Sequence, residues 1–146
     1  MLAMRPRFAL LAGLLVLLPA TAAIACSCRP LASAAEHVGH VDAIFRGRVV
    51  ESIPNPASPE IFSITTFELV SPLKMPSQWG APPERIEVRH ASTRTGPQCA
   101  IWYEPGQEVL VAARMGRDRN LHTSSCDAPR WPESEYRQAL HLAPQP

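Results

Sequence analysis

The residues best able to do chemistry gather at Cys26-Ser27-Cys28, directly after an apolar N-terminal stretch. If the chain is cut before Cys26, that residue carries a free α-amino group with a pKa of about 7.7–8.0, much of it neutral near pH 7.5. A neutral amine and the carbonyl oxygen of the same residue form a five-membered bidentate chelate. Catalytic zinc ions keep one coordination position open for water, which such a chelate could displace. Cleavage would therefore let Cys26 bind the zinc of another protein.

The first 25 residues are typical of a secretory signal peptide. Arg5 and Arg7 provide the positive start, residues 8–18 the apolar run, and Ala23-Ile24-Ala25 the small-x-small pattern that signal peptidase cuts. The apolar run of about 11 residues is shorter than the roughly 20 that a membrane-spanning helix needs. No later stretch of the sequence is longer or more apolar. We therefore expect a secreted or periplasmic protein with one mature domain, residues 26–146, and no membrane span.

The mature chain is almost neutral. Loss of Arg5 and Arg7 lowers the basic residues from 14 to 12, against 13 acidic residues, for a net charge of about −1 with neutral histidines. No basic field remains that would hold a polyanion, which argues against nucleic acid as a partner. The chain has no Gly-rich phosphate loop, no HExxH and no GxSxG motif, so we expect neither an enzyme nor a cofactor. A single lysine among many arginines, with much Ala and Pro, is typical of a GC-rich bacterial genome.

Four cysteines, all in the mature part, predict two disulfides, because an even number in an exported protein favours pairing. Cys26 and Cys28 are separated by one residue, and a ring between them would be strained. Each is therefore expected to reach across the chain, to Cys99 or to Cys126. Loops of roughly 75 to 100 residues would contribute about 4 kcal/mol each in the chain-entropy model.

The remaining sequence predicts a β-rich domain with a helix near each end. Residues 31–41 are predicted as a helix with Ser33 as its cap and Glu36 three residues on, and residues 132–142 as a closing helix that turns Tyr136 inward. Proline-rich loops are expected at residues 54–59 and 72–83. Alternating apolar and β-branched residues predict strands at residues 44–53, 61–70, 85–90, 99–103, 108–115 and 121–126.

This content suits a small closed barrel of the OB-fold type with five strands, and a flat sandwich is the alternative. Gly47, within the first predicted strand, favours a bend or bulge of the kind found at a barrel corner. We see no internal repeat and no second domain.

Three segments resemble the N-terminal domain of the tissue inhibitors of metalloproteinases. The mature start, Cys26-Ser27-Cys28-Arg29-Pro30, is similar to their opening Cys-Thr-Cys-x-Pro. Residues 42–49 resemble their first strand, where an apolar run leads into Phe-x-Gly. The order and spacing of Glu108-Val109-Leu110-Val111-Ala112, Leu121-His122, Cys126 and Trp131 are similar to the end of that domain. The resemblance covers most of residues 26–131 and is weakest between residues 53 and 98.

The resemblance implies a five-stranded OB-like barrel with disulfides Cys26–Cys99 and Cys28–Cys126. It also implies a monomeric inhibitor of zinc metalloproteases, whose partner is the target protease and whose Cys26 chelates the catalytic zinc through its α-amino and carbonyl groups. Ser27 would then lie near the general base of the protease. The sequence has no cysteines for the family's third disulfide, and we expect no separate C-terminal domain. The implied inhibitory edge consists of Cys26, Ser27, Cys28, Pro30, Pro97, Gln98 and Cys99.

Other interpretations are weighed against this one. A non-inhibitory netrin-like binding module of the cell envelope would keep the fold without the target. A redox enzyme would use Cys26 and Cys28 as an exchange pair, which needs an accessible thiol of low pKa. Lipidation of Cys26 is a further alternative, although Ala23 stands where a lipobox usually has leucine.

Two residue groups are weaker candidates. His37 and His40 could supply two metal ligands from one helix, without an evident third ligand. The three tryptophans could form a binding patch, although packing roles are the simpler expectation: Trp79, Trp102 and Trp131.

Overall fold

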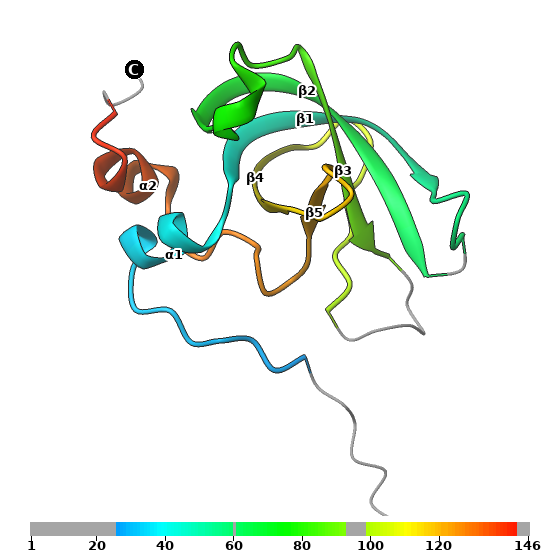
Figure 1. Ribbon diagram of the computed structural model, residues 1–146, viewed down its shortest axis with the longest axis horizontal. Helices are drawn as coiled ribbons and strands as arrows, with labels where there is room; N and C mark the ends of the chain where they lie inside the picture. The colour runs from blue at the N-terminus through cyan, green and yellow to red at the C-terminus, as the bar shows by residue number, and fades with distance from the viewer. Residues whose placement is uncertain (1–25, 60, 93–98, 143–146) are drawn as a thin grey trace, which may run out of the picture.

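A closed barrel of five strands forms the body of the molecule (Figure 1). The computed structural model describes residues 26–59, 61–92 and 99–142. The strands follow the order β1-β2-β3-β5-β4, and only the pair of β3 and β5 is parallel. The expected OB-type barrel with an early and a late helix is confirmed, and the flat sandwich is wrong. The elements are α1 (Ala34–His40), β1 (Ala43–Pro54), β2 (Phe62–Lys74), the 3-10 helix η1 (Ser77–Trp79), β3 (Arg85–Ala91), β4 (Glu108–Met115), β5 (Leu121–Thr123) and α2 (Glu133–Ala139).

Aromatic side chains fill the barrel. The rings of Phe45 and Phe67 meet edge to face with centroids 5.7 Å apart, and Tyr103 meets Phe67 in the same way at 5.0 Å. Gly47 makes this packing possible, since a Cβ atom there would lie 3.0 Å from both phenylalanines. The pairing of β1 with β2 shifts register between Arg46 and Gly47, so the expected bulge is confirmed.

The two helices lie together on one side of the barrel (Figure 1). They cover a second apolar cluster built from Ala34, Val41, Ile44, Leu73, Ala112 and Tyr136. Ser33 caps α1 as expected, because its Oγ accepts a hydrogen bond from the backbone N–H of Glu36 at 3.1 Å. Glu133 of α2 links this helix to the barrel by accepting a hydrogen bond from Arg46 of β1, and it also accepts one from Arg137 of its own helix.

Three of the expected strands differ from the structure. No strand forms at residues 99–103, although the backbone N–H of Ile101 donates to the carbonyl oxygen of Ala91 at the end of β3, at 2.9 Å. β2 runs on to Lys74 and so includes the first three residues of the loop expected at 72–83. Pro72 is tolerated in this strand because β3 pairs with β2 only as far as Glu68, which leaves the β3-facing edge of β2 unpaired at Pro72. β5 ends at Thr123 rather than at Cys126, since the chain then turns.

The two helices of seven residues each are too short to span a bilayer, and no other helix in the described ranges is long and apolar enough to do so.

Candidate functional site

Two disulfides hold the start of the described chain. Cys26 pairs with Cys99 and Cys28 with Cys126, with Cα–Cα distances of 5.2 and 5.1 Å. The pairing implied by the family resemblance is therefore confirmed. All four cysteines are bonded, which leaves no thiol for the redox interpretation.

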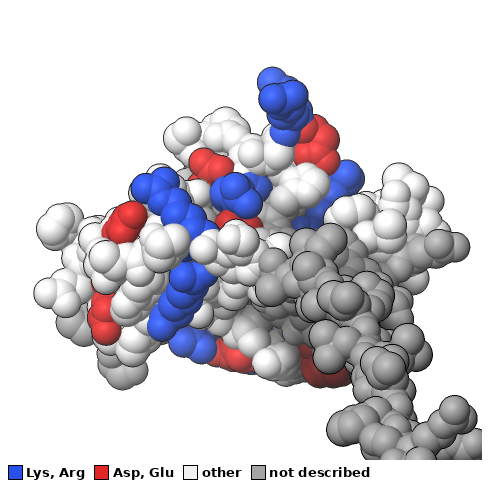
Figure 2. Space-filling model, turned by 90° about the horizontal axis from the view of Figure 1, so that it is seen from below, with Lys and Arg blue, Asp and Glu red and all other residues white. Residues whose placement is uncertain are grey.

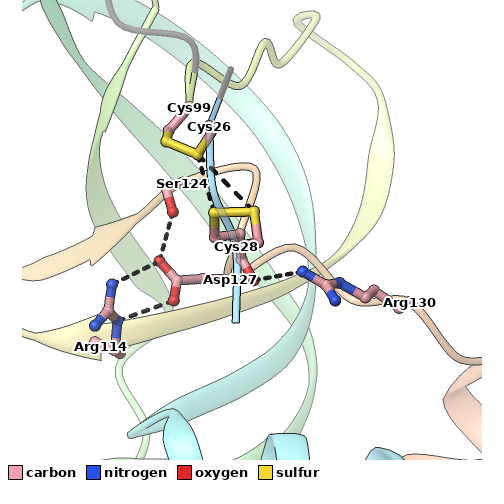
Figure 3. Close-up of a disulfide and its surroundings, with 8 residues drawn as sticks. Cys26, Cys28, Cys99, Arg114, Ser124, Asp127 and Arg130 are labelled. Carbon is pink, nitrogen blue, oxygen red and sulfur yellow. Dashed lines mark hydrogen bonds and ion pairs between the residues drawn. A yellow bond between two sulfur atoms is a disulfide. The ribbon is translucent and has the colours of Figure 1, made fainter. Parts of the chain in front are cut away.

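The two disulfides lie against each other beside the barrel (Figure 3). The Sγ atom of Cys26 is 3.0 Å from that of Cys126 and 3.9 Å from that of Cys28. Three sulfur atoms therefore gather as closely as metal ligands would, but each is already bonded in a disulfide. The contact fixes residues 26–28 to two distant parts of the chain at once.

Residues 26–28 form a tight turn, called here the N-terminal turn. The backbone N–H of Cys28 donates to the carbonyl oxygen of Cys26 at 3.2 Å. This bond uses one of the two lone pairs of that oxygen and leaves the other available. Both cysteines are half-buried, whereas Ser27 between them is exposed. The turn thus presents one short hydroxyl side chain to a partner.

A buried carboxylate braces the segment that carries Cys126. Asp127 accepts from Arg114 Nε at 2.9 Å and from Ser124 Oγ at 2.8 Å (Figure 3). The backbone N–H of Asp127 also donates to the carbonyl oxygen of Ser124 at 3.0 Å, which closes the turn. Arg130 donates to the carbonyl oxygen of Cys126 on the other side. Sequence reasoning missed this brace, although Ser124 and Asp127 have the spacing of a side-chain-stabilised turn.

His37 is buried where α1 meets α2. Its Nδ1 lies 2.6 Å from the Tyr136 hydroxyl, and its ring also contacts Trp131. Burial lowers the pKa of His37, and the nearby backbone of Asp127 opposes that effect. Nε2 nevertheless completes no hydrogen bond of normal geometry with any described residue. The sequence did hold a sign that His37 is buried, because His37 falls on the apolar stripe of the helix that begins at Ala34.

A cleft lies beside the N-terminal turn and is called here the N-terminal cleft. It has a volume of about 510 Å³. Its wall combines the two disulfides with histidine, arginine and hydroxyl side chains. The lining residues are Cys26, Ser27, Cys28, Arg29, Leu31, His37, His40, Cys99, Arg114, Ser124, Cys126 and Asp127.

The other predicted site residues are dispersed. Pro30 is exposed just beyond the N-terminal turn, and Cys99 is half-buried under Cys26. Pro97 and Gln98 lie outside the described residues. His122 bonds Asp118 at 2.9 Å on an exposed turn, where His122 and Asn120 hold the pKa of Asp118 below its ordinary value.

The helix histidines do not assemble a metal site in the described ranges. Apart from the bonded cysteines, no three histidine, cysteine or acidic ligands come close enough together there. Two tryptophans take packing roles, Trp79 against the barrel core and Trp131 against the helix cluster. Trp102 remains 59% exposed.

Comparison with known proteins agrees with this geometry. The family model described as tissue inhibitor of metalloproteinase matches residues 24–140, which is most of the chain. No curated protein matches the sequence. The match covers the N-terminal turn, both disulfides and the whole barrel. The chain therefore belongs to the tissue inhibitor of metalloproteinase family and is an inhibitor-like or netrin-like module.

Proposed function

We propose that the mature chain inhibits a zinc metalloprotease by placing the α-amino nitrogen and the carbonyl oxygen of Cys26 on the catalytic zinc. The observation that carries the proposal is the N-terminal turn, held between two disulfides with Ser27 projecting from it. Family membership supports a metalloproteinase as the class of partner.

The mechanism requires residues 1–25 to be removed as a signal peptide during export. An amide nitrogen has no lone pair to give to a metal, whereas the free amine of a cleaved Cys26 does. The chelate would replace the water of the open zinc position. Because the water is the nucleophile in such enzymes, its displacement stops the reaction.

The shape of the N-terminal turn also fits this role. The second lone pair of the Cys26 carbonyl oxygen is free to accept, since the bond from Cys28 uses only the first. The small side chain of Ser27 would enter the cleft of the protease beside the zinc without clashing. Disulfides on both sides of Ser27 mean that little conformational entropy is lost on binding.

One added residue tests the mechanism. The protein starting at Cys26 is compared with a variant carrying one extra N-terminal alanine, against a panel of zinc proteases. We expect the protein that starts at Cys26 to inhibit and the alanine-extended variant to inhibit at least a hundredfold more weakly, because the extension converts the amine of Cys26 into an amide. A hundredfold loss of affinity corresponds to about 2.7 kcal/mol of binding free energy. A variant with one alanine added at the C-terminus is the matched control. Equal inhibition by all three proteins would refute chelation.

A non-inhibitory binding module is the second candidate, favoured by one observation. Trp102 is 59% exposed and lines a groove with Ile101, Pro129 and Trp131, and this groove shares no lining residue with the N-terminal cleft. This function predicts no inhibition of any protease in the panel. It also predicts a partner in the cell envelope whose capture is insensitive to the N-terminal alanine and is lost on Trp102→Ala.

A further inference from the structure

The N-terminal cleft is rich in hydrogen-bond donors. Arg29, His40, Arg114 and Ser124 are among the residues that line it. The side chains of Arg29 and Arg114 are 70% and 59% exposed, so a ligand can reach both. In the view from below, basic side chains run in a band across the molecule between acidic ones (Figure 2).

The acidic groups near the cleft are already engaged. Asp127 accepts from Arg114 and Ser124, as described above. Arg114 donates to that carboxylate from its Nε and one terminal nitrogen, so the other N–H groups of its guanidinium remain as donors. Glu36 accepts from the backbone of Ala32 at 2.8 Å and lies 3.7 Å from Arg29 and 3.9 Å from Nε2 of His40. The cleft therefore has donors to spare and no free acceptor of comparable strength among its described residues.

His37 adds a ring nitrogen that lacks a hydrogen bond of normal geometry. The Tyr136 hydroxyl accepts from the backbone N–H of Arg130 at 3.3 Å and lies 2.6 Å from Nδ1 of His37. A phenol donates more readily than a neutral imidazole does, so we assign the proton of this contact to the hydroxyl. The ring proton of the neutral imidazole then resides on Nε2. His37 is only 1% exposed and is among the residues that line the cleft; its ring lies near the backbone of Asp127, but Nε2 makes no hydrogen bond of normal geometry with any described residue. An unsatisfied buried donor is costly unless a ligand accepts from it.

We propose that the N-terminal cleft binds a carboxylate, presented by an acidic side chain of the target protease. A carboxylate is the planar, acceptor-only group that matches guanidinium and imidazole donors. The guanidinium groups of Arg29 and Arg114 would repel a metal cation at the same place. Cys26 and Ser27 line the cleft and also form the N-terminal turn, so a protease docked on the turn would overhang the cleft. The identity of the partner, a target protease, rests on the proposed function, whereas the carboxylate site itself does not depend on it.

The site is tested first on the free protein, with acetate as the probe. The imidazole resonances of His37 and His40 are followed by NMR while sodium acetate replaces sodium chloride at constant ionic strength. Saturable shifts are expected in the wild type, with roughly threefold weaker binding in Arg29→Ala, because an exposed ion pair contributes modestly. The matched control is Arg85→Ala, an exposed arginine in a different groove, which should leave the curve unchanged. A linear drift, or one identical curve for wild type and Arg29→Ala, would overturn the site.

The second arm identifies the source of the carboxylate. Inhibition of the most sensitive protease is measured in acetate and in equimolar chloride, for wild type and for Arg29→Ala. Acetate should weaken inhibition by the wild type and should have a smaller effect on the variant. If acetate binds but inhibition is unchanged, a free small carboxylate is the ligand and the partner-borne version is wrong. If no protease is inhibited, the proposed function fails, and the NMR arm still decides whether the cleft binds carboxylates.

Discussion

Two buried histidines show how single residues set the conditions under which this fold is stable. His90 lies inside the barrel, with Nε2 2.6 Å from Thr65 Oγ1 and its ring against Tyr103. Burial lowers the pKa of His90, opposed by the backbone of Ala91 and Ile101. Burial likewise lowers the pKa of His37. Both rings are therefore held neutral in the folded state more strongly than in the unfolded chain.

The free energy of unfolding should consequently fall as the pH drops below about 6.5, the pKa of an ordinary histidine. Below that pH the unfolded chain takes up protons that the folded state takes up only at still lower pH, so acid favours unfolding. Urea unfolding at several pH values between 7.5 and 5 measures the slope. His90→Gln should flatten it, and His37→Gln should do so in part.

The control for this prediction is His40→Gln, an exposed position on the same helix as His37. It should leave the slope as in the wild type. A wild-type stability that is constant or rises between pH 7 and pH 5 would contradict the assignment of these two histidines.

At the scale of elements, the bulge in β1 depends on a missing side chain. A Cβ at Gly47 would meet Phe45 Cε2 and Phe67 Cβ at 3.0 Å, inside the barrel core. Gly47→Ala should therefore lower the free energy of unfolding by about 1–3 kcal/mol, the usual cost of overpacking a core. Urea denaturation at neutral pH measures this difference.

The chain offers a matched control for the same substitution. Gly39 lies in α1 with nothing within 4 Å of an added Cβ. Because alanine favours a helix over glycine by about 1 kcal/mol, Gly39→Ala should be neutral or stabilising. If both substitutions destabilised equally, the cost would come from glycine conformation in general and not from the contact of Gly47 with the two rings.

The elements also mark how far the sequence predicts this molecule. Alternation predicted β1 well, since Phe45 and Val49 face the core while Arg48 and Val50 face outward. It failed at residues 99–103, because an apolar pattern does not reveal that this segment makes a single backbone bond to β3, from Ile101 to Ala91, instead of a ladder. The two disulfides were predicted because the number and spacing of the cysteines are visible in sequence, and their pairing was implied by the family resemblance. The roles of Asp127 and His37 were missed because they depend on tertiary contacts. Asp127, in the turn that follows β5, bonds Arg114 of β4, and His37 of α1 bonds Tyr136 of α2, far along the chain.

At the scale of the whole molecule, the disulfides do two separable things: they stabilise the fold and they keep the N-terminal turn rigid. The two bridges close loops with sequence separations of 73 and 98. Removing either should cost about 2–5 kcal/mol of stability in a domain of this size. Stability alone, however, does not position Ser27 and the carbonyl oxygen of Cys26. That needs residues 26–28 to be held before a partner arrives.

Replacing Cys28 and Cys126 by alanine separates these roles, because residue 26 keeps its amine, its carbonyl and its own disulfide. We expect a folded barrel of lower stability that inhibits about tenfold less well, since one or two loosened residues must then be ordered on binding at about 0.5–1.5 kcal/mol each. Gly47→Ala, which weakens the barrel without touching the turn, is the matched control. Inhibition constants are measured at a temperature where circular dichroism shows both variants to be folded. Loss in the cysteine variant alone would establish that the bridge acts through rigidity of the turn, whereas equal loss in both would mean that only overall stability matters.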